Sequence, residues 1–155
     1  MKSDSNITIK EVINSDELKK FVMFPHTLYK DSKYWVAPII KEELEVLNKE
    51  TNPVFNNAIA HYFLAYIDGE IVGRIAALIN WIEVKDLKKK KVRFGWFDFI
   101  DDQNVSKALL EKVIEIGKKN NLEFIEGPVG FSNMDKAGML IKGFEKKNTM
   151  ITMYN

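Results

Sequence analysis

The segment most informative about the fold is residues 92–129, VRFGWFDFIDDQNVSKALLEKVIEIGKKNNLEFIEGPV. Its opening residues, up to Ile100, are rich in aromatic side chains and apolar on both alternating faces, which is typical of a central strand covered on both sides. Residues 102–120 show the spacing of an amphipathic helix, whose apolar face is formed by Val105, Leu109, Val113 and Ile116. Residues 123–129 predict a second strand. The stretch therefore predicts two neighbouring parallel strands joined by a helical crossover.

A β-hairpin is predicted upstream of this unit. Residues 62–67 and 71–79 are apolar and are joined by Asp68-Gly69, two residues that tolerate the positive φ of a tight hairpin turn. Residues 7–13 alternate apolar and polar side chains as a short strand does. This order of elements predicts the α/β (α+β) class, with a mixed sheet that carries helices on both faces.

Two helices are predicted between the first strand and the hairpin. Asn14 offers an N-cap, and Glu17 follows it at the spacing of a capping box. That helix extends to Leu28, and Pro25 must bend or interrupt it. Residues 39–47 predict a second helix, with one apolar face formed by Ile40, Leu44 and Leu47.

The remaining segments give weaker patterns. Residues 87–91 contain a run of lysines without interleaved aromatic residues, which predicts a solvated loop. Residues 139–141 predict a short helix closed by Gly143, and residues 150–153 predict a further strand.

Composition excludes several function classes. A chain of 155 residues is the size of one domain, and its net charge of +1 gives no electrostatic reason to expect nucleic acid or a membrane as a partner. The absence of cysteine excludes disulfides and thiol chemistry, and His26 and His61 lie too far apart to form a local metal-ligand pair, so we expect no metal. The N-terminus does not resemble a secretion signal, and no apolar run approaches the roughly 18 residues of a membrane span, so we expect a cytoplasmic location.

The chain resembles the GNAT (N-acetyltransferase) superfamily, and within it the N-terminal half of a group of larger bacterial proteins with two GNAT-like domains. The order of short motifs carries the resemblance over nearly all of the chain beyond residue 20. These motifs are Phe24-Pro25, Leu28-Tyr29-Lys30, Trp35-Val36, Asn52-Pro53-Val54-Phe55, Phe63-Leu64-Ala65-Tyr66, Asp68-Gly69, Val72-Gly73-Arg74-Ile75-Ala76, Arg93-Phe94-Gly95, Ile100-Asp101-Asp102, Gly127-Pro128-Val129, Gly143-Phe144 and Met153-Tyr154-Asn155. The resemblance implies a mostly antiparallel central sheet, an acetyl-CoA or other acyl-CoA donor, and an amine acceptor.

In GNAT proteins the turn after the long strand holds the cofactor pyrophosphate, and its usual pattern is Arg/Gln-x-x-Gly-x-Gly/Ala. One register places Asp101 at the Arg/Gln position and Asn104 and Ser106 at the glycines; another starts the motif at Gln103. The cofactor candidates that the resemblance implies are Ile100, Asp101, Gln103, Asn104, Val105, Ser106 and Lys107. The acidic pair Asp101-Asp102 instead predicts a helix that caps itself and repels a diphosphate.

The catalytic candidates are carboxylates on the predicted strands and one tyrosine. Asp98 is predicted to share a face with Phe94 and Trp96, where burial would raise its pKa toward that of a general base. Glu126 lies on the following strand, and Tyr154 is a candidate general acid by the resemblance to GNAT tyrosines. Arg74, inside an apolar strand, is predicted to point to solvent or to pair with an acid.

GNAT domains continue with a further helix and more strands, so the resemblance implies that the domain of residues 1–155 is incomplete at its C-terminus. We therefore expect an uncovered sheet edge, marginal stability, and a partner that is either a second GNAT-like domain beyond Asn155 or a dimer mate. Two functions follow from these observations. The chain is either a GNAT-fold domain of an acyl-CoA-dependent N-acyltransferase or a non-catalytic GNAT-like partner module with a degenerate cofactor turn.

Overall fold

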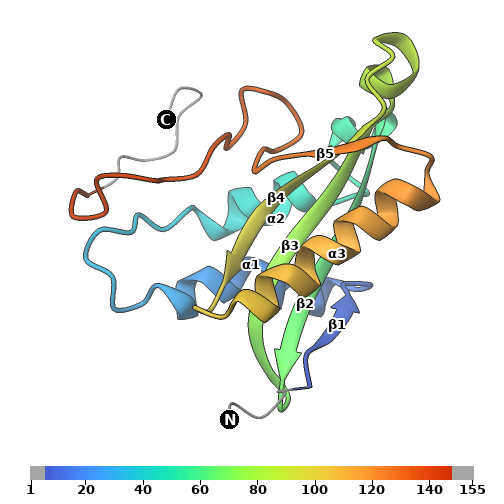
Figure 1. Ribbon diagram of the computed structural model, residues 1–155. Helices are drawn as coiled ribbons and strands as arrows, with labels where there is room; N and C mark the ends of the chain where they lie inside the picture. The colour runs from blue at the N-terminus through green and yellow to red at the C-terminus, as the bar shows by residue number, and fades with distance from the viewer. Residues whose placement is uncertain (1–5, 148–155) are drawn as a thin grey trace.

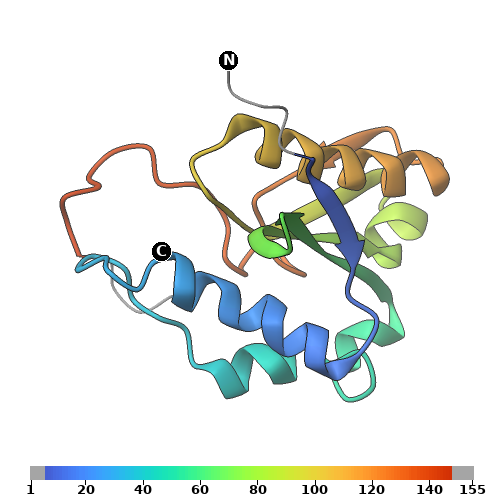
Figure 2. The ribbon, with the colours of Figure 1, turned by 90° about the horizontal axis from the view of Figure 1, so that it is seen from below.

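The computed structural model describes residues 6–147 and shows one open β-sheet with helices on both faces (Figures 1 and 2). The five strands lie in the order β1-β2-β3-β4-β5, with only the last pair parallel. Their bounds are β1 Thr8–Glu11, β2 Ala58–Ile67, β3 Glu70–Asn80, β4 Lys91–Phe99 and β5 Phe124–Glu126. The helices are α1 Ser15–Leu28, α2 Ile40–Leu47 and α3 Gln103–Lys119, with shorter helical turns at Pro53–Asn56 and Ile82–Asp86. The predicted mixed, mostly antiparallel sheet is confirmed.

The β2–β3 hairpin turns at Asp68 and Gly69, whose φ angles are 50° and 86°. Positive φ at both central residues matches the right-handed twist of the flanking strands, as the sequence predicted. The parallel pairing of β4 with β5 runs from Lys91↔Phe124 to Arg93↔Glu126, which confirms the strand–helix–strand unit. β5 is shorter than predicted because Pro128, two residues after its end, has no N–H for a ladder.

The sheet separates two apolar cores. One lies under α3 and includes Val92, Phe94 and Val105, and the other lies under α1 and α2 and includes Phe21, Leu47 and Trp96. Figure 2 shows the sheet between these two helical layers. The predicted apolar face of α2 is confirmed, since Leu47 is fully buried and Ile40 and Leu44 pack against the same core.

The start of α1 forms as the capping pattern predicted. The Glu17 N–H donates to Asn14 Oδ1 at 2.9 Å, and the Ile13 N–H donates to Glu17 Oε2 at 2.8 Å. Pro25 does not interrupt the helix, which continues to Leu28. A proline in a helix has no N–H for the carbonyl four residues earlier. That carbonyl belongs to Phe21, and it accepts from Arg74 Nη1 at 2.9 Å instead.

A β-bulge in β4 corrects the predicted faces of this strand. The register shifts opposite Arg74 and Ala76, and Trp96 has a φ of 46°. One extra residue moves every later side chain to the opposite face. Phe94 therefore packs under α3 whereas Trp96 packs under α1 and α2, and Asp98 shares a face with Trp96 but not with Phe94.

Two further predictions are wrong. Residues 139–141 form no helix: Met139, Leu140 and Ile141 are exposed and have no regular structure, since so short a segment cannot offset the cost of helix nucleation. The lysine loop ends at Lys90, because Lys91 begins β4, is buried, and pairs with Glu83 at 3.3 Å and with Glu126. The strand predicted at residues 150–153 lies outside the described residues.

Candidate functional site

A cavity of about 390 Å³ lies at the carboxyl-terminal half of β4. It is lined by Tyr29, Ser32, Tyr34, Trp35, Asp98, Leu140, Phe144 and Lys146. The loop after α1 and the segment after β5 form its walls, and Figures 1 and 2 both show these two segments side by side. The fold thus brings together residues that are more than a hundred positions apart in the sequence.

Asp98 is the carboxylate of this cavity, and its orientation is fixed by two donors. The Tyr29 hydroxyl donates to Oδ1 at 2.9 Å, and Arg74 Nε donates to Oδ2 at 2.8 Å. The Asp98 side chain is 20% exposed and the Arg74 side chain 6%. Each carboxylate oxygen can accept a second hydrogen bond, so Asp98 keeps acceptor capacity toward the cavity.

Arg74 lies beneath Asp98 and joins it to α1. Its guanidinium lies 5.1 Å from the centre of the Phe21 ring, in addition to its hydrogen bond to the Phe21 carbonyl. The prediction that Arg74 pairs with an acid is confirmed, and it does not point to solvent. The ion pair is aligned by the direct opposition of Arg74 and Asp98 in the β3–β4 ladder.

Tyr29 remains a hydrogen-bond donor over the physiological range. Burial raises the pKa of its hydroxyl, and the neighbouring Asp98 carboxylate raises it further. The Tyr29 ring also packs on Trp35, with 5.3 Å between ring centroids. His26 packs edge-on against the same Trp35 at 5.2 Å. Tyr29 was not among the site residues predicted from the sequence, although it lies in one of the motifs that carried the resemblance.

The turn that leads from β4 into α3 uses its backbone donors internally. The Asp102 carboxylate caps the helix by accepting from the Asn104 N–H at 2.8 Å. The Val105 and Ser106 N–H groups approach the Asp102 carbonyl at 3.1 and 3.3 Å. This geometry confirms that the helix caps itself through Asp102.

The other residues proposed for this turn point in different directions. The side chains of Asp101, Gln103, Asn104 and Lys107 are exposed, whereas Val105 is buried in the core under α3. The Ile100 N–H donates to the Val72 carbonyl at 2.9 Å, and the Ser106 hydroxyl donates to the Gln103 carbonyl at 3.0 Å.

Glu126 is not part of the cavity. It lies opposite Arg93 at the other end of β4 and pairs with Lys91. Its neighbour there, Glu83, accepts from Arg93 Nε at 2.9 Å. Burial alone would raise the pKa of Glu83, but hydrogen bonds and charges from Arg93 and Lys91 outweigh it and lower that pKa. Tyr154 lies outside the described residues.

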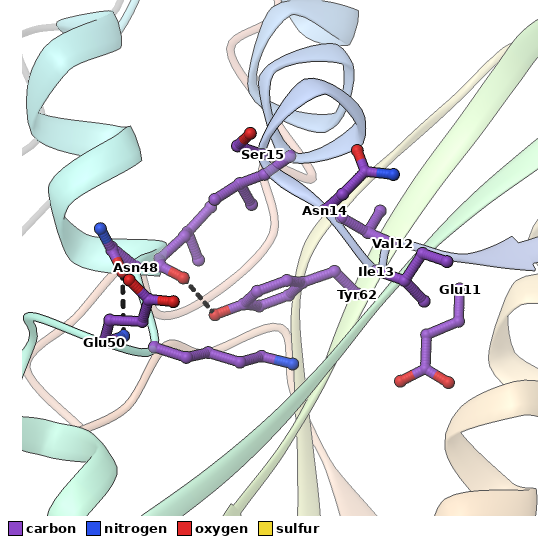
Figure 3. Close-up of a pocket in the computed structure, with 11 residues that line it drawn as sticks. Glu11, Val12, Ile13, Asn14, Ser15, Asn48, Glu50 and Tyr62 are labelled. Carbon is purple, nitrogen blue, oxygen red and sulfur yellow. Dashed lines mark hydrogen bonds between the residues drawn. The ribbon is translucent and has the colours of Figure 1, made fainter.

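A second cavity, of about 470 Å³, lies between the start of α1 and the end of α2 (Figure 3). Tyr62 forms its floor and donates to the Leu47 carbonyl at 3.0 Å. Lys49 lies 5.0 Å from the Tyr62 ring centre; burial lowers its pKa, against the opposing charge of Glu11. His61 contacts Glu11 at 2.6 Å on the opposite face of the sheet, where its ring stacks on Phe63. This cavity shares no lining residue with the Asp98 cavity.

Within residues 6–147 no group of acidic or histidine side chains has the arrangement of a metal site. Over that same range, none of the helices is both long and apolar enough to cross a bilayer.

Comparison with known proteins identifies the fold. No family model matches the chain. Among curated proteins, it is 33% identical to Protein YghO of Escherichia coli over 88% of the chain and 35% of that protein. It is 27% identical to the bacterial ceramide synthase of Caulobacter vibrioides over 92% of the chain and 38% of that enzyme. The chain therefore spans little more than a third of the length of these relatives.

Among solved structures, the fold matches a tandem GNAT protein from the clavulanic acid biosynthesis pathway with a TM-score of 0.58 and 12% identity, over 76% of the chain and 34% of that protein. It also matches a predicted acetyltransferase from Clostridium acetobutylicum solved with acetyl-CoA, with a TM-score of 0.57 and 13% identity, over 77% of the chain and 79% of that protein. The chain thus has the GNAT fold, as the resemblance implied.

Proposed function

We propose that this chain is a GNAT-fold domain of an acyl-CoA-dependent N-acyltransferase, and that its Asp98 cavity receives the acceptor amine. The observation that carries the proposal is the position of Asp98. It is a carboxylate held by two donors near the C-terminal end of β4, and it faces a cavity of ligand size. The relative named a bacterial ceramide synthase supports this reaction class, because a ceramide is an amide.

In this proposal the chain's own residues orient the acceptor and manage its proton. Asp98 accepts an N–H of the amine and is available to take its proton as the nitrogen attacks an acyl carbon. Arg74 and the Tyr29 hydroxyl fix the carboxylate, so the nitrogen is placed without the entropic cost of ordering Asp98 during the reaction. The acyl-CoA supplies the activated acyl group and a thiolate leaving group.

The start of α3 does not fit the diphosphate of a CoA molecule. Asp101 and Asp102 place two carboxylates where a polyanion would sit, and the Asn104 N–H is already used by Asp102. Like charges at close range cost about 4 kcal/mol per pair at an effective dielectric constant near 20. We therefore propose that the acyl-CoA binds on a second GNAT-like domain, an arrangement supported by the similarity to a tandem GNAT protein.

A second candidate follows from the same turn: the domain is a non-catalytic GNAT-like partner module that takes no part in the chemistry. The observation that favours this candidate is the Asp102 cap, which occupies a backbone donor that a cofactor would need. The candidate also requires that Asp98 has no role in the reaction.

Two measurements test these proposals. Calorimetric titration of this chain with acetyl-CoA tests our placement of the cofactor: we expect no heat at millimolar ligand, and micromolar binding would overturn that placement. If such binding also weakened in Asp101→Arg, the electrostatic argument would be wrong as well. The second measurement separates the two candidates. In the full-length protein, Asp98→Asn is expected to lower kcat for amine acylation about a hundredfold, as loss of a general base does. An unchanged kcat in Asp98→Asn would rule out the catalytic candidate and leave the non-catalytic partner module.

A further inference from the structure

We propose that the turn between β3 and β4, residues 82–90, docks this protein on the surface of an anionic lipid bilayer. Figure 1 shows the turn projecting beyond the ends of these two strands. It precedes the first residue of β4, whereas Asp98 lies near the last. The inference therefore goes beyond the proposed function and does not depend on it. Docking of this kind is peripheral, so it requires no helix that spans the bilayer.

The turn concentrates positive charge. Residues 85–90 contain four lysines and one aspartate and carry a formal charge of +3, whereas the whole chain carries +1. The expectation drawn from the net charge, that no membrane is a partner, therefore averages over a strongly uneven distribution. Lys90 pairs with Glu123 at 2.9 Å, but no ion pair within residues 6–147 involves Lys85, Lys88 or Lys89. All three are exposed, so their charge is available to an anionic surface.

Two aliphatic side chains are exposed on the same turn. Leu87 is 57% exposed and Ile82 is 45% exposed. The Leu87 N–H donates to the Ile82 carbonyl at 3.1 Å, which makes these residues neighbours. Insertion of such side chains between lipid headgroups removes apolar surface from water. The turn thus combines the two features of a peripheral membrane-binding segment, an apolar group that inserts and lysines that attract anionic headgroups.

The conformation of the turn is fixed from below. Trp81 and Val84 pack against the core under α3, on the side away from the exposed pair. The Lys89 N–H donates to the Glu83 carbonyl at 2.8 Å, and the Glu83 carboxylate accepts from the buried Arg93 Nε at 2.9 Å. The turn is therefore ordered before it meets a partner, which lowers the entropic cost of docking.

Lys88 has a backbone conformation that residues with a side chain rarely adopt. Its φ is 56°, in the left-handed region. A glycine would adopt this conformation at a lower cost in free energy, so the turn itself gains nothing from a lysine here. Strain of this kind indicates that the side chain has a role outside the turn, and attraction to an anionic surface is such a role.

The composition of the turn favours lipid over nucleic acid. Single-stranded nucleic acids are bound by basic side chains interleaved with aromatic rings on which the bases stack. Residues 82–90 contain no aromatic residue, and Lys85 Nζ covers the adjacent Trp81 ring at 5.2 Å from its centre. An exposed aliphatic pair gains nothing from a phosphate backbone but is stabilised among lipid chains.

The test is co-sedimentation of the whole protein with vesicles at low salt. Vesicles of phosphatidylcholine with about a third phosphatidylglycerol should bind it about tenfold or more tightly than phosphatidylcholine alone, since each lysine near an anionic surface contributes about fivefold. High salt should release the protein because it screens the lysines. Equal binding to the two kinds of vesicle, no binding to the anionic ones, or tighter binding to a single-stranded oligonucleotide at the same salt would overturn the proposal.

Charge variants locate the docking surface. Lys88→Gln combined with Lys89→Gln is expected to weaken binding to the anionic vesicles about twentyfold. Lys19→Gln combined with Lys20→Gln is the matched control, because it removes the same charge from exposed residues of α1, and it should weaken binding less than about twofold. Equal losses in the two double variants would show that attraction to the whole protein, and not the turn, drives binding.

Two further variants separate the apolar contact and the role of Lys88. Leu87→Ser should weaken binding about fivefold, whereas Ile13→Ser, at an exposed residue next to β1, should not change it. Lys88→Gly should weaken binding about fivefold while leaving the thermal unfolding midpoint unchanged or higher. Unchanged vesicle binding in Leu87→Ser, or a lower midpoint with unchanged binding in Lys88→Gly, would contradict the proposal.

Discussion

Arg74 Nη1 donates a hydrogen bond to the Phe21 carbonyl at 2.9 Å, and that carbonyl is the one that Pro25 leaves without a helical partner. The same guanidinium holds Asp98 through Nε. A single buried arginine therefore compensates a proline inside α1 and fixes the carboxylate of the candidate site. The position of α1 and the orientation of Asp98 are coupled through it.

A double-mutant cycle on Arg74 and Pro25 tests this coupling. Arg74→Met leaves Asp98 and the Phe21 carbonyl short of a donor, and it is expected to cost about 3 kcal/mol of unfolding free energy. Pro25→Ala restores an N–H that can bond the Phe21 carbonyl, so Arg74→Met should cost about 1 kcal/mol less in that background. Urea denaturation measures all four proteins, and strict additivity of the two changes would contradict the coupling.

The N-cap of α3 is predicted to stabilise the domain. Asp102→Ala removes the acceptor for the Asn104 N–H and is expected to cost about 1 kcal/mol in thermal or urea unfolding. Asp101→Ala is the matched control, since Asp101 is exposed and does not cap the helix, and it should change stability by less than about 0.5 kcal/mol. Equal losses of unfolding free energy in the two variants would mean that the Asp102 cap does not stabilise the domain.

Acid sensitivity is predicted for the Glu83 ion pairs. The pKa of Glu83 is lowered in the folded protein from its ordinary value of 4.5, so its contribution is present above that pH and is lost as the pH falls through the folded value. The unfolding free energy of the unmodified protein should therefore fall below about pH 4.5 more steeply than that of Glu83→Gln. Glu115→Gln alters a solvent-exposed carboxylate that pairs with Lys112, and its pH profile should follow that of the unmodified protein. Parallel profiles for the unmodified protein and Glu83→Gln would refute the prediction.

Gly95 is predicted to admit no side chain. A Cβ at this position would lie 2.5 Å from the Val129 carbonyl oxygen. The backbone of Val129 is fixed there because its N–H donates to the Phe94 carbonyl. Gly95→Ala is expected to cost about 2 kcal/mol, because the two backbone segments must separate. Gly117→Ala is the comparison, since its Cβ would meet only the Val92 side chain, at 2.9 Å. The higher helix propensity of alanine, about 1 kcal/mol, should offset part of the steric cost of that contact. A smaller loss of unfolding free energy for Gly95→Ala than for Gly117→Ala, measured with urea, would contradict the prediction that position 95 admits no side chain.

The exposed edge of the sheet is predicted to cause self-association. β5 is an edge strand, and Phe124 and Ile125 are 50% and 38% exposed on it. Unpaired strand edges with apolar side chains pair with other chains unless they are covered. Sedimentation velocity of this chain should show association that Phe124→Lys reduces, while Ile13→Lys, at an even more exposed apolar residue next to β1, should have no effect. A monomer at every concentration would contradict the expectation.

Local sequence patterns predicted most of the helices and strands and their order. The period of apolar residues predicted α3, the Asp68-Gly69 pair predicted the hairpin, and Asn14 with Glu17 predicted the start of α1; each signal lies within a few residues of the feature it specifies. The same local chemistry predicted the Asp102 cap.

Local patterns did not predict which side chains meet, because those contacts form only when the chain folds. The bulge at Trp96 reversed the faces of the later residues of β4. A bulge is an extra residue relative to the paired strand, so the sequence of β4 alone does not reveal it. The partners of Arg74 come from α1 and β4, and the cavity walls come from segments more than a hundred residues apart. Such contacts depend on how the chain returns to itself, so a local pattern predicts the residues but not the site that they form.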